Sequence, residues 1–132
     1  MDELIWIDDW QMQCCGEAFE IGSQVSWTVG DPVSEGLIGA LGPDVASGLT
    51  GAEDHHAADP GALRRVAGKV TSIRAAYCMF ASRAGAERSD GRPVEGTRHL
   101  VKRRKAGGWE PDGRDLDPPT NFVGYVVKLE TS

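Results

Sequence analysis

The sequence predicts an all-β fold, a small antiparallel barrel of the SH3-like or OB-like type with five or six strands. Several segments alternate apolar and polar residues with a period of two, which is typical of half-buried strands. The 17 glycines and 7 prolines cluster between these segments, and no long stretch keeps a helical period. A two-sheet β-sandwich is the alternative architecture.

The length of 132 residues fits a single domain, residues 1–132, that can bury a hydrophobic core without metal or disulfide support. The hydrophobic fraction of 40% and the charged fraction of 26% place the chain among ordinary globular proteins. The N-terminus has no basic region and no long apolar run. We therefore expect neither a signal peptide nor a membrane span, and a cytoplasmic location.

The first strand is expected over residues 3–13. Its even-numbered side chains share one face, which we expect to be buried, and they include Trp6, Asp8 and Trp10. A short extended piece follows at residues 19–21, between glycine turn signals.

The clearest alternation runs over residues 24–29 and predicts a half-buried antiparallel strand. Its apolar side chains should face inward: Val25, Trp27 and Val29. Residues 31–62 show no sustained period of two and read as a long Gly/Pro-rich loop or insertion, with a short helical turn within 33–41. Loops of this length are usually functional or mobile.

The third strand region is expected over residues 66–77, with a β-bulge near residues 72–73. Residues 89–92 (Ser-Asp-Gly-Arg) predict a hairpin turn, because Asp-Gly supplies the positive φ that such turns need. Residues 94–105 should form the next strand, and residues 106–121 a Pro/Gly-rich connection.

The closing strand is expected over residues 122–130, with its faces divided by the same period of two. The side chains predicted to face inward are Val123, Tyr125, Val127 and Leu129. Those predicted to face outward are Gly124, Val126 and Lys128.

Charge is divided along the chain. Residues 1–63 contain no lysine or arginine and carry a formal charge of −12, residues 64–105 carry +9, and residues 106–132 carry −3, which gives −6 in total. Such segregation shapes the electrostatic field and the choice of partner, and does not choose a fold.

The strongest basic cluster lies at the end of the middle segment, followed by an indole in a polar loop: Arg98, Lys102, Arg103, Arg104, Lys105 and Trp109. Basic groups beside an exposed aromatic ring predict contact with a protein partner or with nucleic-acid phosphates and bases. The acidic total argues against nucleic acid, since nucleic-acid-binding domains are typically basic. The simpler interpretation is that these bases offset the acidic N-terminal strands.

One group of residues has the right atoms for a metal site, with zinc as the possible ion: Cys14, Cys15, His55 and His56. Neighbouring residues in a strand point to opposite faces, so both cysteines reach one ion only if Gly16 turns the chain. A free cysteine more often behaves as a small buried hydrophobe. No cofactor is expected apart from this candidate.

Asp8 is the candidate buried acid. A regular strand places its carboxyl between Trp6 and Trp10, where desolvation would raise its pKa, and perturbed acids mark candidate sites. The alternatives are a bulge that places Asp8 in water, or a salt bridge to an arginine of the middle segment.

The patterns of common catalytic and nucleotide-binding sites, Gly-x-Ser-x-Gly, the P-loop and Gly-x-Gly-x-x-Gly, are absent. The leading hypothesis is therefore a non-enzymatic binding module for a protein or nucleic-acid partner. A metal-dependent or thiol enzyme built on the cysteines and His55/His56 is the first alternative. The second is a small-molecule binder with tryptophans and Asp8 at the barrel mouth.

The N-terminal segment contains the run Trp6-Ile7-Asp8-Asp9-Trp10-Gln11-Met12-Gln13-Cys14-Cys15-Gly16, followed by Phe19-Glu20-Ile21-Gly22 and Val25-Ser26-Trp27. These motifs resemble the opening of a family of short actinomycete proteins of unknown function. The resemblance extends over most of the chain, including residues 66–74 and the segment Gly124-Tyr125-Val126-Val127. It implies no activity, so no catalytic residue is carried over from it.

Overall fold

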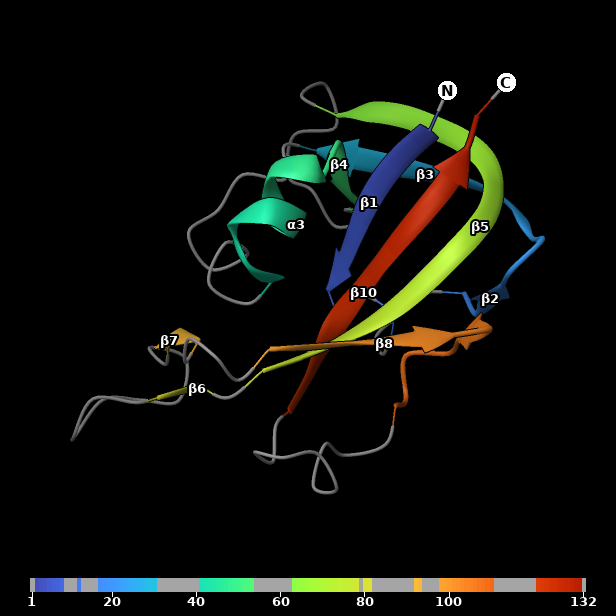
Figure 1. Ribbon diagram of the computed structural model, residues 1–132. Helices are drawn as coiled ribbons and strands as arrows, with labels where there is room; N and C mark the ends of the chain where they lie inside the picture. Colours follow the sequence, from blue (N-terminus) through green and yellow to red (C-terminus); the bar gives the residue numbers. More distant parts are fainter. Residues whose placement is uncertain are drawn as a thin grey trace.

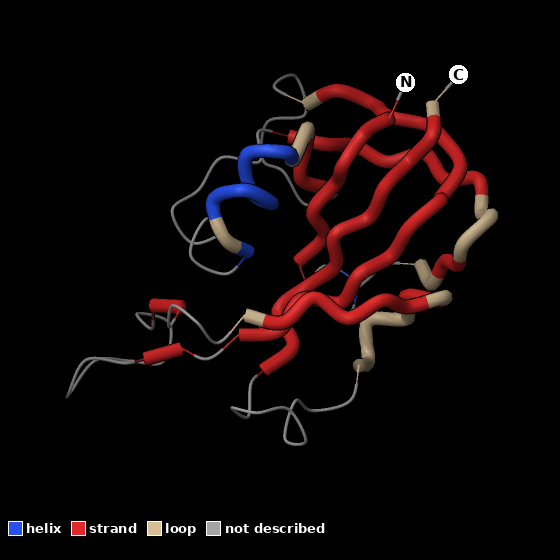
Figure 2. The backbone as a smooth tube through the Cα atoms, in the orientation of Figure 1, coloured by secondary structure: helices blue, strands red, loops and turns tan. Residues whose placement is uncertain are grey.

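The structure is a computed structural model, and it describes residues 2–8, 12, 17–30, 41–53, 63–78, 80–81, 92–93, 98–110 and 121–131. Most of these residues lie in strands, and the short helix α3 (Pro43–Gly48) lies on the outside of the sheet, beside β1 and β4 (Figures 1 and 2). The predicted all-β class is confirmed.

The strands are β1 (Asp2–Asp8), β2 (Phe19–Glu20), β3 (Gln24–Gly30), β4 (Gly51–Glu53), β5 (Arg64–Cys78), β6 (Phe80–Ala81), β7 (Arg92–Pro93), β8 (His99–Arg103), β9 (Lys105–Ala106) and β10 (Asn121–Glu130). The main sheet has the order β10-β1-β4-β3-β5-β8, and β10 also pairs with β5. The five strands β10, β1, β4, β3 and β5 therefore close into a ring, which confirms a barrel-like arrangement. The pairing of β1 with β4 is parallel, so the sheet is mixed, whereas the sequence predicted an antiparallel one.

The long strand β5 curves around the molecule and joins three neighbours (Figure 1). It pairs with β3 through residues 64–69, with β8 through residues 73–77, and with β10 along residues 69–78. β5 can pair with three strands because it is 15 residues long. β3 and β8 pair with its first and second halves along one edge, and β10 pairs along the other edge.

A β-bulge lies in β5 at Thr71. Opposite it, Lys128 pairs with Ser72 and Leu129 pairs with Val70, so Thr71 is the extra residue. The bulge reverses which parity faces the interior. Buried side chains are even-numbered before it and odd-numbered after it: Val66, Val70, Ile73, Ala75 and Tyr77. The bulge predicted near residues 72–73 is confirmed to within one residue.

The barrel interior is filled by aliphatic side chains from β1, β3, β5 and β10, together with an aromatic cluster at one end. Phe19 packs edge-to-face on Trp27 at 5.0 Å between ring centroids, and Phe122 packs in the same way on Tyr125 at 5.0 Å. Edge-to-face pairs stabilise such a cluster beyond their buried area. The predicted inward face of β3 is confirmed: Val29 is buried, while Val25 and Trp27 are partly buried against the core.

A second hydrophobic cluster lies between the sheet and the segment that contains α3. Its buried members are Trp6, Leu41, Leu49, Ala76 and Val126. Pro43 suits the first turn of a helix, where its missing N–H has no partner to lose. Because this segment covers the outside of β1, both faces of that strand are buried.

The predicted inward face of β1 is wrong for the barrel interior. Ile5 and Ile7 fill the interior, and Trp6 is buried in the second cluster instead. The strand ends at Asp8, and the remaining part of the expected strand, from residue 9 on, lies outside the described residues except for Met12. A period of two identifies a strand but does not say which face meets the core when both faces are apolar.

The division of faces predicted for β10 is partly wrong. Phe122 pairs with Tyr77 and Gly124 pairs with Ala76, so Val123 is an extra residue at a second bulge. Phe122 consequently packs on the interior and Val123 on the second cluster. Val126, predicted to face outward, is buried in the second cluster, whereas Tyr125, Val127 and Leu129 face inward as predicted.

Gly124 is required by the packing of β1 on β10. A Cβ at this position would overlap the carbonyl oxygen of Ile7 and lie 2.5 Å from the Trp6 ring. The glycine therefore lets the indole lie directly on the backbone of β10.

Two elements inside residues 31–62, α3 and β4, were not predicted. The helical turn expected within 33–41 lies outside the described residues apart from Leu41. The turn expected at 89–92 also lies outside them except for Arg92, although the flanking strands β6 and β7 pair antiparallel. Of the strand expected over 94–105, the structure describes β8 and β9.

Candidate functional site

The loop after β9 carries the most exposed large hydrophobic side chain among the described residues. Trp109 is 78% exposed, and Figure 2 shows its loop leaving the barrel beyond β9. The residues on both sides of Trp109 are bound to a single hydroxyl group. The Tyr125 hydroxyl accepts a hydrogen bond from the Gly108 amide at 3.1 Å and donates one to Glu110 Oε1 at 2.8 Å.

This hydroxyl belongs to a larger, partly buried polar network. Glu110 Oε2 accepts a hydrogen bond from Arg103 Nε at 3.0 Å, and Arg103 also bonds the Tyr77 side chain. Burial raises the pKa of Tyr125, with the adjacent Glu110 carboxyl acting in the same direction. Partial burial disfavours the charged form of Arg103, but its hydrogen bonds to Glu110 and Tyr77 outweigh this and raise its pKa. The network thus holds the loop 107–110 against the barrel.

The predicted basic cluster is divided by the fold. Lys102, Arg104 and Lys105 are exposed, whereas Arg103 turns toward Glu110. Arg98 is partly buried, and its guanidinium lies 3.0 Å from the position that a Cβ on Gly42 would take, at the start of α3. Three of the five bases therefore remain as an exposed group next to the Trp109 loop in the sequence.

A second exposed apolar side chain accompanies this group. Ile21 is 47% exposed, and its amide donates to the carbonyl oxygen of Arg104 at 2.9 Å. β2 and β9 pair antiparallel through two residues each. Ile21 directly follows the last residue of β2, and Trp109 lies three residues after the last residue of β9, Ala106, at the opposite end of this pairing. We call Lys102, Arg104, Lys105, Ile21 and Trp109 the contact edge.

Several ion pairs join the acidic N-terminal segment to bases further along the chain. Arg64 contacts Glu3 at 3.1 Å, Lys128 contacts Asp2 at 3.4 Å and Lys105 approaches Glu20 at 4.0 Å. Hydrogen bonds from Arg64 and from the Thr50 hydroxyl lower the pKa of Glu3. Folding thus offsets part of the charge that is segregated in the sequence. Mostly exposed pairs such as Lys105 with Glu20 are weak and leave Lys105 able to change partner.

Asp8 lies on the same face as Trp6, as the alternation predicted, but outside the barrel interior. The Trp6 indole Nε1 donates a hydrogen bond to Asp8 Oδ1 at 2.8 Å. The carboxyl is partly buried, and the second predicted neighbour, Trp10, lies outside the described residues.

The predicted metal ligands Cys14, Cys15, His55 and His56 all lie outside the described residues. Within the described ranges, no group of three or more His, Cys, Asp and Glu side chains could hold a metal ion. Cys78 is buried and free, and burial raises its pKa to about 11, which keeps this thiol protonated and unreactive at neutral pH.

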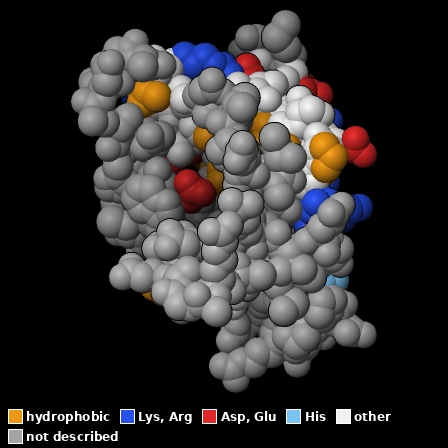
Figure 3. Space-filling view, turned by 90° about the vertical axis from the view of Figure 1, so that its left-hand side faces the viewer, with side chains coloured by type: hydrophobic (Ala, Val, Ile, Leu, Met, Phe, Trp, Pro, Cys, Tyr) orange, Lys and Arg blue, Asp and Glu red, His pale blue; other side chains and the backbone are white. Residues whose placement is uncertain are grey.

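A pocket of about 460 Å³ opens at the end of the barrel, between β1, β2, β3 and β4. Its described lining includes apolar side chains and two carboxyl groups: Ile7, Met12, Phe19, Trp27, Glu17 and Glu53. On the face in Figure 3, an acidic side chain lies recessed in a hollow beside hydrophobic atoms. Of the tryptophans expected at a barrel mouth, Trp27 lines this pocket, whereas Trp6 is buried in the second cluster.

No local pattern in the amino-acid sequence indicates the Tyr125 network or this pocket. Tyr125 and Glu110 are 15 residues apart. Glu53 and Trp27 line the same pocket because β4 pairs with β3, which places Glu53 opposite Val29. The alternation in β3 was the one pattern that placed a pocket residue, Trp27, on the correct face.

Comparison with known proteins places the chain in a family. A family described as "Family of unknown function (DUF6578)" matches residues 1–131. The chain belongs to this family. The expectation that the chain belongs to a family of unknown function is thereby confirmed. No curated protein and no solved structure matches the chain.

The family carries no assigned activity, so the site must be judged on its own geometry. Among the described residues, none of the helices is both long enough and apolar enough to cross a membrane.

Proposed function

We propose that the protein is a binding module that holds an acidic segment of a protein partner on the contact edge. The observation that carries the proposal is Trp109, which is 78% exposed although both of its neighbours are bound to the buried Tyr125 hydroxyl. Exposure of the indole to water is unfavourable in the isolated protein, and burial of its apolar surface against a partner would be favourable.

The anchoring of the loop favours binding in a second way. A side chain whose backbone is already fixed loses less conformational entropy when a partner immobilises it. Tryptophan and arginine are also the residues most often found at the energetic centre of protein interfaces. Trp109 would fill a cavity of the partner, while Lys102, Arg104 and Lys105 would steer acidic groups toward the edge.

A protein partner is favoured over nucleic acid by two features. The chain carries a net charge of −6, which opposes long-range attraction of a polyphosphate. In addition, Ile21 gives the edge an exposed aliphatic side chain, which suits an apolar side chain of a peptide and offers no stacking surface to a base.

The test uses a fluorescein-labelled 12-residue peptide that alternates glutamate with leucine, and fluorescein-labelled dT12 as the competing ligand. We expect saturable binding of the peptide, an affinity reduced about tenfold by Trp109→Ala, and no binding of dT12. A triple variant, Lys102→Gln, Arg104→Gln and Lys105→Gln, should slow association and reduce its dependence on salt.

The matched control is Arg65→Gln, which neutralises an exposed base at the start of β5, where β5 pairs with β3. It should leave peptide affinity unchanged. Binding of dT12 but not of the peptide would replace this proposal with a nucleic-acid function. Failure of both ligands to bind, or an affinity indifferent to Trp109→Ala and the triple variant, would refute it.

A further inference from the structure

Two bases lie directly opposite each other on the outer face of the sheet, where β5 pairs with β8. Arg74 is the partner of Lys102 in the register of these strands, and Figure 1 shows β8 beside the second half of β5. Both side chains face away from the barrel interior, because the residues that alternate with them pack on the interior cluster: Ile73, Ala75 and Val101. We call Arg74 and Lys102 the basic pair.

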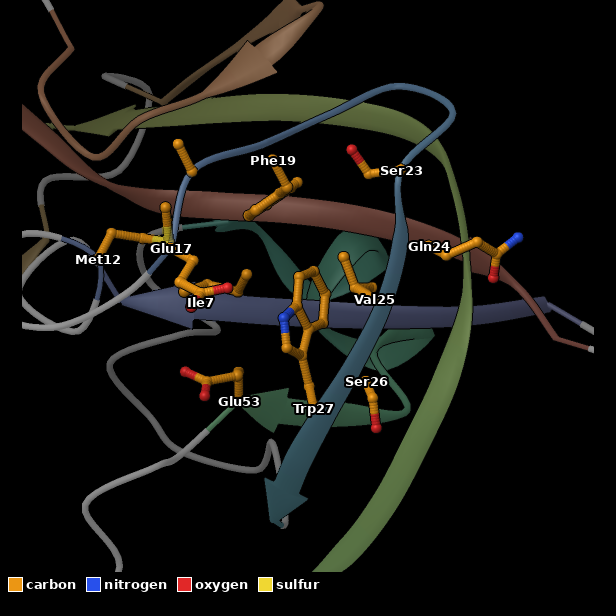
Figure 4. A pocket seen from close by; sticks show the side chains of 11 residues that line it. Ile7, Met12, Glu17, Phe19, Ser23, Gln24, Val25, Ser26, Trp27 and Glu53 are labelled. Carbon is orange, nitrogen blue, oxygen red and sulfur yellow. The ribbon is translucent and has the colours of Figure 1, made fainter.

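The basic pair is separate from the pocket at the end of the barrel. Neither base is among the described lining residues of that pocket. In Figure 4 the Trp27 ring points from β3 toward Phe19, and both rings belong to the interior. A ligand at the basic pair would therefore contact the opposite face of the sheet.

The positive charge of the basic pair is not compensated within the described part of the chain. No ion pair or hydrogen bond joins the side chain of Arg74 or Lys102 to a described residue. The other neighbours of Arg74 on this face are uncharged: Ser72 and Ala76 along β5, and Val126 on β10. Like charges directly opposite each other in a sheet are destabilising. An anion bound between the two bases would remove this repulsion.

The positions of the two bases allow both side chains to reach one anion. The Cβ atoms of directly opposite residues lie about 4.5–5.5 Å apart, and both side chains are long and flexible. Lys102 is exposed, whereas Arg74 is partly buried and lies opposite Val126 of the second hydrophobic cluster. An arginine on an apolar surface packs its stem there and keeps its guanidinium in water. The planar guanidinium can then donate two parallel hydrogen bonds to an oxyanion.

A phosphate group on a side chain matches the basic pair better than a carboxylate does. Phosphoserine and phosphothreonine carry a charge of about −2 at pH 7 and three acceptor oxygens. Two oxygens would accept hydrogen bonds from Arg74 and the third one from Lys102, so that the charges cancel. A carboxylate, or a phosphodiester of nucleic acid, carries a single negative charge and would leave one positive charge unmatched.

We propose that the basic pair binds a phosphorylated serine or threonine of the protein partner. This inference rests on the proposed function, because Lys102 also belongs to the contact edge and the phosphate would lie in the same acidic segment. Trp109 would contact the segment in either state, and Arg74 with Lys102 would add contacts that form only after phosphorylation. Binding would thus respond to phosphorylation of the partner.

The test compares three forms of the labelled glutamate–leucine peptide that carry phosphoserine, glutamate or serine at one central position. We expect the phosphoserine peptide to bind at least about tenfold more tightly than the glutamate peptide. Arg74→Gln should remove this preference, and Lys102→Gln, at an exposed position, should reduce it. Trp109→Ala should weaken all three peptides by a similar factor. Arg65→Gln is the matched control, because it neutralises another arginine of β5 where that strand pairs with β3, and it should leave the preference unchanged.

A second measurement separates the phosphate site from the proposed function. Phosphoserine blocked as N-acetyl methylamide is titrated into isotope-labelled protein, and amide chemical shifts are followed by nuclear magnetic resonance. We expect shift changes centred on Arg74 and Lys102 that Arg74→Gln removes.

Equal binding of the three peptides, or a phosphoserine preference that survives Arg74→Gln, would overturn the phosphate site and leave the proposed function standing. If none of the peptides binds, the proposed function fails and blocked phosphoserine decides the phosphate site. Shift changes at the basic pair would then support the site, and their absence would overturn it as well.

Discussion

The Tyr125 hydroxyl can be removed without changing the shape of its ring, and this change tests the anchoring of Trp109 directly. In Tyr125→Phe the aromatic contacts with Phe19 and Phe122 remain, because these involve the ring alone. The bonds to Gly108 and Glu110 are lost, while Glu110 keeps its contact with Arg103.

The expected loss of stability follows from the two bonds. The bond accepted from the Gly108 amide is neutral and contributes about 1 kcal/mol, and the bond donated to the Glu110 carboxylate contributes about 1.5–3 kcal/mol. We therefore expect the free energy of unfolding to fall by about 3 kcal/mol. For a domain of this size, that lowers the melting temperature by roughly 10 °C.

The assay is urea unfolding followed by far-ultraviolet circular dichroism, combined with titration of the acidic peptide. Tyr125→Phe should weaken peptide binding although Trp109 is still present, because the loop must then be ordered on binding. Tyr77→Phe is the control: its hydroxyl belongs to the same network through Arg103, whereas the two residues beside Trp109 are bound by the Tyr125 hydroxyl. A Tyr125→Phe protein within about 0.5 kcal/mol of wild type, or one with unchanged peptide affinity, would refute the reasoning.

Three further predictions concern stability and pH. Gly124→Ala should lower the free energy of unfolding by about 3 kcal/mol, because the added Cβ would overlap the backbone of β1. Gly107→Ala is the control, because nothing lies within 4 Å of a Cβ there, and it should change the free energy of unfolding by less than about 0.5 kcal/mol. Urea unfolding of both variants measures these changes. The pKa of Cys78 is raised by burial from 9.0 to about 11, so the fold favours the neutral thiol, and the stability that this provides is complete below pH 9 and lost as the pH rises toward 11. Cys78→Ala should flatten that part of the pH–stability curve. The pKa of Glu3 is lowered by its hydrogen bonds to Arg64 and Thr50. The ionised carboxylate therefore contributes to folding stability above about pH 4.5, and this contribution is lost as the pH falls further. Glu3→Gln should remove this acid-dependent loss of stability, which melting curves recorded between pH 3 and 6 would measure.

Much of the fold followed from local patterns. The strands β3, β5 and β10 were predicted nearly to their ends, and so was the bulge beside Ser72, because a change in the parity of apolar residues within one strand is visible in the sequence alone. The faces of β1 were assigned wrongly, since its alternation sets tryptophan against isoleucine and both kinds of side chain are buried. Only the position of α3 decides between them, and that depends on contacts distant in the sequence.

The candidate sites were less accessible to sequence reasoning. The exposure of Trp109 was predicted from its polar Gly/Pro loop, and the structure confirms it. Its anchoring by Tyr125 was not predicted, because the tyrosine reads as an ordinary inward-facing strand residue. Glu53 was overlooked for a similar reason. A three-residue strand carries too few positions to show a period, so nothing marked this acid as part of a barrel.

The closure of the ring through β4 has a dynamic consequence. This strand contributes two residue pairs to β1 and two to β3, whereas β5 and β10 are joined by nine. Local opening occurs where cooperative structure is thinnest. Within the ring of five strands, amide protons in the pairings of β4 should therefore exchange first and those between β5 and β10 last. Glu53 ends β4 and lines the pocket at the end of the barrel. Separation of β4 from its neighbours would therefore widen this pocket while the rest of the barrel stays intact.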